Sequence, residues 1–283
     1  MQINGILLVN KERGMSSNTV VNKVKKILQA EKAGHLGTLD VLGEGLLPVT
    51  LGKGTKLFDY FLKKDKTYLT VFKFGQTTST LDLEGDIIAQ NDVVVTKEMI
   101  DEVLHKFIGK IKQVPPKYSA KKVEGKRAYQ LAREGKRLNL PANEITIYSI
   151  ECINKMDFNT YTFLVHCSSG TYIRSLCRDL AAQFGTFGVM QYIQRTKCGD
   201  FSIRNSYSLD QIQKGNYKII ELDKIFNRKK KIQLDDESTQ KLLNGCIINT
   251  DLNNGTYRAY NQNQFLGLVI VRENKLKFKL RLI

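Results

Sequence analysis

Hydrophobic and polar positions alternate along the chain in a way that predicts both strands and helices. Residues 6 to 9 form a short apolar run typical of a buried strand, and two later segments, 68 to 74 and 161 to 167, alternate with a period of two. Helical spacing of apolar residues predicts helices around residues 20 to 28, 99 to 107 and 176 to 184. Strands and helices are mixed, without a simple β-α-β repeat.

The segment from Gly34 to Gly54 follows neither period. It begins with the glycine-rich stretch G-H-L-G-T-L-D-V-L-G-E-G and continues as an apolar run. Its glycines permit tight turns and close approach of a ligand, so Asp40 is the best candidate for a catalytic carboxylate. Taken alone, an Asp in such a loop is more often a turn former, and His35 is more often a packed histidine than a catalytic one.

A second candidate, Arg174, lies at a predicted strand-to-helix junction. The stretch from Cys167 to Leu176 follows a strand and leads into a helix that Gly185 ends. An isolated arginine is usually a surface residue. A buried one needs a carboxylate partner, which it would hold ionised, and Asp40 is a candidate for that partner.

The chain is strongly basic, and the excess charge changes the expected partner. Among its 283 residues, 42% are hydrophobic, enough for a folded core of one large or two unequal domains. Lys and Arg outnumber Asp and Glu by 44 to 28, which gives a net charge of +16. Nucleic acid is the expected partner for such a surface. A membrane surface is the weaker alternative, because no apolar run approaches the length of a spanning helix.

Basic residues gather in two places. Between Pro115 and Arg137 they far outnumber the acidic residues Glu124 and Glu134, so we expect an exposed excursion from the core. The run from Arg228 to Lys231 marks a second change of pattern, and we place a domain boundary near residue 230.

Several chemistries find no support in the sequence. Gly52-Lys53-Gly54-Thr55 resembles a phosphate-binding loop, but the glycine required four residues earlier is missing. The three histidines have no metal-site spacing, and the five cysteines are scattered without a CxxC pair, so we expect neither metal nor cofactor. The N-terminus lacks the features of a signal or transit sequence, which favours a cytoplasmic protein.

Six motifs, in order along residues 34 to 201, resemble the tRNA pseudouridine synthase B family. They are G-H-L-G-T-L-D (34 to 40), K-T-Y (66 to 68), F-G-Q-T-T-S-T-L-D-L-E-G (74 to 85), P-P-K-Y-S-A-K-K (115 to 122, within a longer block to residue 135), G-T-Y-I-R (170 to 174) and I-Q-R-T with G-D-F (193 to 201). There are departures: Val41 replaces the usual proline, Glu12 follows Lys11 where the family has proline, and Ile193 replaces leucine. The C-terminal region resembles the family's small PUA-like domain more weakly.

The resemblance implies an α+β pseudouridine synthase fold. Its central sheet would be mixed and mainly antiparallel, flanked by helices and loops. Residues 1–228 would be the catalytic domain, with a basic RNA-clamping insertion at about 112–140, and residues 229–283 a β-rich PUA-like RNA-binding domain. The implied activity is isomerisation of uridine 55 in the T-loop of tRNA by a tRNA pseudouridine synthase, an intramolecular transferase that needs no cofactor and no metal.

The resemblance also assigns roles to residues. Asp40 would be the catalytic carboxylate, Arg174 its partner and Tyr68 the residue that stacks on the target base. His35, Gly37, Thr38, Lys11 and Ile193 would bind the substrate, His35 by filling the place of the flipped-out base. RNA contacts are expected from Lys117, Tyr118, Lys121, Lys122, Lys126, Arg127 and Arg133.

Other interpretations remain at this stage. A non-catalytic tRNA-binding or RNA-folding protein could use the same scaffold and the same charge, and an RNA-guided relative would work within a larger assembly. A hydrolase that uses Asp40 on another substrate would leave the basic insertion unexplained. We expect tRNA, through its T-loop and acceptor-T arm, to be the partner of a monomer that requires no other protein and no membrane.

Overall fold

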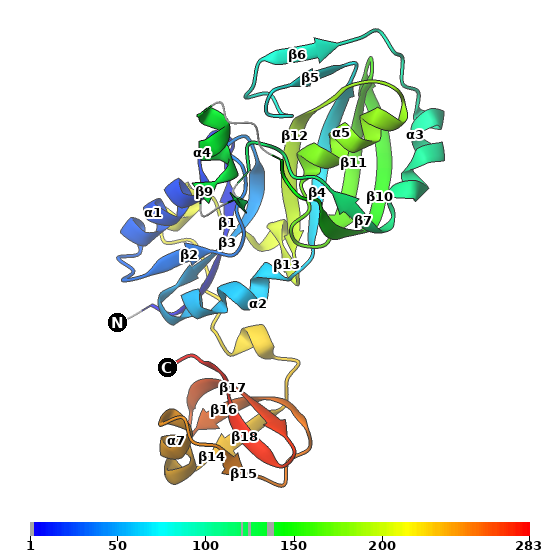
Figure 1. Ribbon diagram of the computed structural model, residues 1–283. Coiled ribbons are helices and arrows are strands. Elements are labelled where there is room, and N and C mark those ends of the chain that lie inside the picture. Colours follow the sequence, from blue (N-terminus) through cyan, green and yellow to red (C-terminus); the bar gives the residue numbers. More distant parts are fainter. Residues whose placement is uncertain (1–2, 120, 124–125, 135–138) are drawn as a thin grey trace.

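The protein folds around two sheets of unequal size, which a short connection joins (Figure 1). The computed structural model describes residues 3–119, 121–123, 126–134 and 139–283. The larger sheet and its helices contain two clusters of buried side chains and most of a third, which also includes residues near the C-terminus. The smaller sheet is built from the C-terminal residues and has a core of its own.

In the described part of the chain, nine strands form the main sheet, in the order β1-β3-β12-β4-β11-β10-β7, with β2 paired to β3 and β13 paired to β12. The strands are β1 (Gly5–Lys11), β2 (Ala33–His35), β3 (Glu44–Leu51), β4 (Lys66–Phe74), β7 (Gly109–Gln113), β10 (Asn143–Asp157), β11 (Thr160–Cys167), β12 (Gly188–Cys198) and β13 (Phe201–Ser202). Among these described strands, only β3 and β12 pair in parallel. The prediction of a mixed, mainly antiparallel sheet is confirmed.

Helices form where the sequence predicts them. Helix α1 (Ser17–Ile27) begins after Ser16, whose side chain accepts a hydrogen bond from the Thr19 N–H. Helices α3 (Lys97–Leu104) and α5 (Ile173–Gln183) pack on one face of the sheet, against buried side chains of β4 and β11 (Figure 1). The shorter helical elements are η1 (Gly52–Leu57), α2 (Phe58–Leu62), η2 (His105–Phe107), η3 (Ile203–Asn205), α6 (Leu209–Gln213) and η4 (Lys224–Phe226).

Two excursions leave the main sheet. One is the hairpin of β5 (Gln76–Thr78) and β6 (Ile87–Gln90). The other is the predicted basic insertion between β7 and β10, which contains β8 (Lys122–Val123), β9 (Lys126–Arg127) and α4 (Ala128–Arg133). Residues 120, 124–125 and 135–138 of that insertion lie outside the described residues.

The smaller sheet follows η4, with strands in the order β14-β16-β17-β18-β15. Its elements are β14 (Lys231–Leu234), α7 (Asp236–Leu243), β15 (Ile248–Asn249), β16 (Gly255–Asn261), β17 (Gln264–Arg272) and β18 (Lys275–Arg281). Leu268 and Leu282 pack with Leu222 and Phe226 against the larger part, so the two sheets share an apolar contact. Among the described residues, no helix is long and apolar enough to cross a membrane.

Candidate active site

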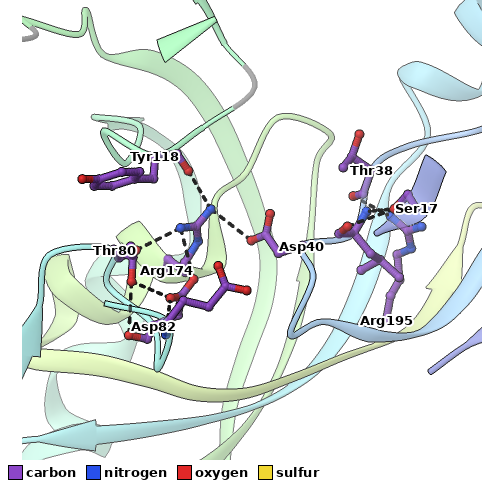
Figure 2. A network of polar contacts seen from close by, with 10 residues as sticks. Ser17, Thr38, Asp40, Thr80, Asp82, Tyr118, Arg174 and Arg195 are labelled. Carbon is purple, nitrogen blue, oxygen red and sulfur yellow. Dashed lines mark hydrogen bonds and ion pairs between the residues drawn. The ribbon is translucent and has the colours of Figure 1, made fainter. Parts of the chain in front are cut away.

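Arg174 lies at the centre of a buried polar network, in the first turn of α5 (Figure 2). Its side chain is 7% exposed and contacts two carboxylates. Nη2 is 3.0 Å from Asp40 Oδ2, and Nη1 is 3.2 Å from Asp82 Oδ2. The guanidinium also donates to the carbonyl of Thr80 over 2.9 Å and to the carbonyl of Tyr118 over 3.0 Å. The ion pair of Asp40 with Arg174 that the sequence suggested is therefore present.

The two carboxylates differ in exposure, and this difference separates their roles. The Asp82 side chain is 4% exposed, and its Oδ1 accepts hydrogen bonds from Thr80 Oγ1 and the Glu84 N–H. The Asp40 side chain is 46% exposed. A buried guanidinium needs a buried counter-charge, which Asp82 provides. Asp40 is therefore the carboxylate that a substrate can reach.

The backbone around Asp40 is fixed by side chains from other elements. Ser17, at the start of α1, both accepts from the Leu39 N–H and donates to the Leu39 carbonyl, each over 2.9 Å. Lys11, at the end of β1, donates to the carbonyls of Val41 and Gly43. The loop that carries Asp40 is therefore held on both sides of the carboxylate.

Lys11 is almost completely buried. Burial lowers its pKa from 10.5 to about 8, although the nearby charges of Asp40 and Glu44 oppose that shift. Its ammonium reaches three backbone carbonyls, those of Glu12, Val41 and Gly43. Any contribution of Lys11 to substrate binding would therefore act through the loop.

Arg195 braces the other half of the same loop. Its side chain is 1% exposed and donates to the carbonyl of Leu46 over 2.8 Å and to that of Gly37 over 3.0 Å. Gly37 has a φ of +124°, and an added Cβ would lie 3.5 Å from Arg195 Nη1. This backbone conformation favours glycine, which brings the loop close to the guanidinium.

Tyr68 and Ile193 lie on neighbouring strands and belong to the same buried cluster as Leu39 of the loop. Tyr68 of β4 lies opposite Arg195 of β12, and both Tyr68 and Ile193 are 8% exposed. Burial raises the pKa of the Tyr68 phenol well above its ordinary value, although Arg195 beside it acts in the opposite direction. Tyr68 is therefore a neutral phenol at physiological pH. Ile193 packs in the same buried apolar cluster as Tyr68.

His35 lies at the start of the loop, and Thr38 lies within it. His35, on β2, is half-buried, and its Nδ1 has no hydrogen-bond partner among the described residues. Burial and the charge of Arg195 lower the pKa of His35, so the imidazole is neutral. The Thr38 side chain is exposed, as Asp40 is, whereas Leu36 and Leu39 point into the core.

Comparison with known proteins identifies the family of the chain. Residues 25–173 match the model of the "TruB family pseudouridylate synthase (N terminal domain)". A tRNA pseudouridine synthase B from Caldanaerobacter subterraneus subsp. tengcongensis is 39% identical over 284 residues, which span 99% of each chain. One from Clostridium novyi is 41% identical over 98% of this chain and 99% of the relative.

The chain belongs to the TruB family of tRNA pseudouridine synthases.

Solved structures agree with this membership at the level of the fold. One chain of a Cbf5-Nop10-Gar1 complex is similar to this protein, with a TM-score of 0.67 and 23% identity. The match covers 94% of this protein and 78% of the chain in that complex. An H/ACA RNP bound to a substrate RNA containing 2'-deoxyuridine matches 99% of this chain and 85% of that chain, with a TM-score of 0.69 and 21% identity. The chain thus has the pseudouridine synthase fold, with a C-terminal PUA-like sheet.

Residues of the basic insertion contact both the Arg174 network and the main sheet. Lys117 is exposed, while the carbonyl of Tyr118 contacts Arg174. Lys121 donates to the carbonyl of Pro141 over 2.9 Å and to Asn143 Oδ1 over 2.7 Å, which ties the insertion to the start of β10. The structure describes only the backbone of the other predicted RNA contacts, so these stay predictions: Lys122, Lys126, Arg127 and Arg133.

Three residues of the site were not assigned a role from the sequence. Asp82 and Arg195 lie inside motifs of the resemblance, and Ser17 lies outside all of them. Asp82 lies between Leu81 and Leu83 and nevertheless carried a signal, because a charged residue surrounded by apolar ones usually has a buried partner. Arg195 has polar neighbours on both sides in the sequence and carried no such signal. Ser17 carried none, since its contact with Leu39 depends on how α1 packs against the loop.

Proposed function

We propose that this protein isomerises uridine 55 in the T-loop of tRNA to pseudouridine, with Asp40 as its catalytic carboxylate. The observation that carries the proposal is the geometry of Asp40. Its carboxylate is half-exposed, lies 3.0 Å from a buried guanidinium, and stands on a loop that three other elements hold in place. Such preorganisation lets one charged group act on a bound nucleotide without first reorganising its surroundings.

The reaction breaks the bond between N1 and C1' and forms a bond between C5 and C1' of the same sugar. The proton on C5 leaves, and N1 gains one, so the product is an isomer of the substrate. In this proposal Asp40 acts either as nucleophile at C1' or as base at C2', and Arg174 keeps it aimed. Tyr68 stacks on the base, and Ile193 closes an apolar wall behind it. No electron or group donor enters, so we propose no cofactor.

For the RNA, we propose that the insertion at 112–140 clamps the T-loop and that shape rather than sequence specifies it. The target base must leave the stack, at a cost of a few kcal/mol. His35, a neutral and half-buried ring beside the loop, would fill the vacated place. We further propose that residues 1–228 and 229–283 are separate domains, and that the protein works as a monomer in the cytoplasm, where its tRNA substrate is found.

Position mapping tests this proposal. Unmodified tRNA transcripts are incubated with the protein, and pseudouridines are located by carbodiimide derivatisation and primer extension. We expect a single modified position in the T-loop, which disappears when uridine 55 is replaced by cytidine. Modification elsewhere would contradict the assigned position. Tight binding without modification would instead indicate a tRNA-binding or RNA-folding protein.

A further inference from the structure

The start of α5 is held by a residue from outside the helix. Its N-cap residue, Tyr172, makes no side-chain capping bond. Instead, the carboxamide of Gln113 accepts from the Tyr172 N–H over 2.8 Å and donates to the Tyr172 carbonyl over 3.1 Å. Gln113 is the last residue of β7 and is 1% exposed. A buried amide thus fixes both backbone groups of the residue two positions before Arg174.

The chain that follows Gln113 continues along the same helix. The carbonyl of Val114 accepts from Ser175 Oγ and from Arg178 Nη2, each over 2.9 Å. The carbonyl of Tyr118 then accepts from Arg174 Nη2, the same nitrogen that lies 3.0 Å from Asp40 Oδ2. Residues 113 to 118 therefore form a strap along the first turns of α5, and the strap shares Arg174 with the catalytic carboxylate.

The bonds of this strap are not equivalent. The carbonyls of Val114 and Tyr118 accept from side chains of α5, and both lie beyond the end of β7, outside the main sheet. Gln113 is still within β7, where it lies opposite Asn143 of β10. Among the contacts of the strap, the Gln113 carboxamide is the one that ties the backbone at the helix start directly to the main sheet.

We propose that Gln113 is a positioning residue for the isomerisation: by fixing Tyr172, it sets the place of the Arg174 guanidinium against Asp40. This inference rests on the proposed function. A carboxamide suits the task because it is a donor and an acceptor at once, as the two backbone groups of Tyr172 require. A misplacement of about 1 Å at a reacting group can cost on the order of 10²-fold in rate.

The chain offers a matched control for this role. Asn159, in the turn between β10 and β11, is also a buried amide that holds a backbone donor and acceptor. It accepts from the Val95 N–H over 2.9 Å and donates to the Val93 carbonyl over 2.7 Å. Those contacts lie before α3 and involve none of the residues around Asp40. Loss of the Asn159 amide should therefore lower stability without changing the chemical step.

The test compares Gln113→Glu with Asn159→Asp, each of which replaces an amide nitrogen by a carboxylate oxygen. The single-turnover rate constant at saturating protein, the Kd for tRNA and the Tm are measured for both. We expect Gln113→Glu at pH 8 to lose on the order of 10- to 10²-fold in rate with little change in Kd. Asn159→Asp should keep the wild-type rate of its folded fraction, despite a comparable loss of Tm.

Lowering the pH supplies a readout that a merely structural role would not change. In the Gln113→Glu variant, protonation of the introduced carboxyl group restores a donor for the Tyr172 carbonyl, so the rate relative to wild type should rise as the pH falls. Gln113→Met, which has no group to protonate, should lose rate without this recovery. If Gln113→Glu does not fold, the rate of Gln113→Met is compared with that of Asn159→Asp instead.

Two results would overturn the inference. One is a folded Gln113 variant with a wild-type single-turnover rate, and the other is an equal loss of rate in Asn159→Asp. Both differ from a failure of the proposed function itself, in which the wild-type protein would not modify tRNA at all.

Discussion

Two aspartates share one guanidinium in this protein, and their surroundings differ. Asp82 is buried and hydrogen-bonded by Thr80 and Glu84, whereas Asp40 is half-exposed on its loop. Removing a carboxylate from a buried ion pair leaves an uncompensated charge, which costs far more than neutralising an exposed carboxylate. Asp82 should therefore matter chiefly for stability, and Asp40 chiefly for the reaction.

The same substitution at both positions separates these roles. Asp82→Asn should lower the free energy of unfolding by about 3 kcal/mol, because Arg174 stays buried with one half-exposed partner. Asp40→Asn should lower it by no more than about 1 kcal/mol. Urea denaturation followed by circular dichroism measures both changes. Equal losses would contradict the assignment of Asp82 as the buried counter-charge.

The pKa of Lys11, lowered by burial to about 8, predicts a pH dependence of the reaction. Below pH 8 the ammonium is charged and donates to three carbonyls of the Asp40 region. Above about pH 8, the neutral amine of Lys11 has only two N–H donors and no longer attracts the Asp40 carboxylate. We therefore expect the single-turnover rate to fall as the pH rises through about 8, and Lys11→Met, already slower, to lack this decline. A wild-type rate that stays constant up to about pH 9.5, well above this pKa, would contradict this role.

At the residue scale, the sequence predicted the parts of the site that local patterns and motifs carry. Asp40 lies in a glycine-rich loop and Arg174 at a strand-to-helix junction, and both are inside motifs of the resemblance, so their pairing could be inferred before the structure was known. Asp82 and Arg195 were not assigned roles, because their partners are brought to them by strands and loops from distant parts of the chain. Burial of those two charges follows from the fold as a whole.

At the element scale, a short parallel pairing joins β3 to β12. Arg195 lies opposite Gly45 there, and Gly45 has a φ of +96°. A Cβ added to Gly45 would lie 2.6 Å from the Arg195 carbonyl oxygen, closer than side chains approach. This junction connects the strand that follows the Asp40 loop to the strand that carries Arg195 and Ile193.

Gly45→Ala therefore combines backbone strain with a clash between two strands. We expect it to lower the free energy of unfolding by about 3 kcal/mol or more, the upper end of the range for a strained residue. The control is Gly215→Ala, where φ is +77° but nothing lies within 4 Å of an added Cβ. It should cost only the strain, about 1 to 2 kcal/mol. Equal costs in urea denaturation would show that the close approach at Gly45 is unimportant.

The predicted elements agree with the structure where the hydrophobic pattern is regular. The strands expected at 68 to 74 and 161 to 167 are β4 and β11, and the helix expected at 176 to 184 is α5. The segment from 34 to 54, predicted to be irregular, contains the end of β2, the Asp40 loop, β3 and the start of η1. The pairing of β3 with β12 could not be predicted, because the parallel register depends on strands far apart in the sequence.

At the scale of the whole molecule, the net charge of +16 and the exposure of Lys117 support the proposal that the surface of the insertion attracts tRNA. Each lysine that contacts a phosphate adds counterion release, and so steepens the loss of affinity with salt. The insertion, labelled at α4 in Figure 1, lies over the half of the larger part that holds α1, whereas α3 lies at the far edge beside β10. Lysines of the insertion and lysines of α3 should therefore differ in their effect on RNA binding.

Lys117→Ala should weaken tRNA binding and reduce the slope of log Kd against log salt by about 0.7 to 0.9, one phosphate contact. Lys97→Ala, on α3, removes a lysine that pairs with Asp101 and should leave the slope unchanged. Filter binding between about 50 and 200 mM salt, the range over which such contacts are separated, measures both. Equal slopes for Lys117→Ala and wild type would show that Lys117 makes no contact with an RNA phosphate.

We propose that Asp40 performs the isomerisation of a uridine in tRNA. The most direct test of this claim is tritium release from T-loop RNA labelled at C5 of uracil, with wild type and Asp40→Asn, alongside the affinity of both for that RNA. We predict release by wild type and none by Asp40→Asn, although both bind. Release by Asp40→Asn at the wild-type rate, or binding by wild type without release, would contradict this claim.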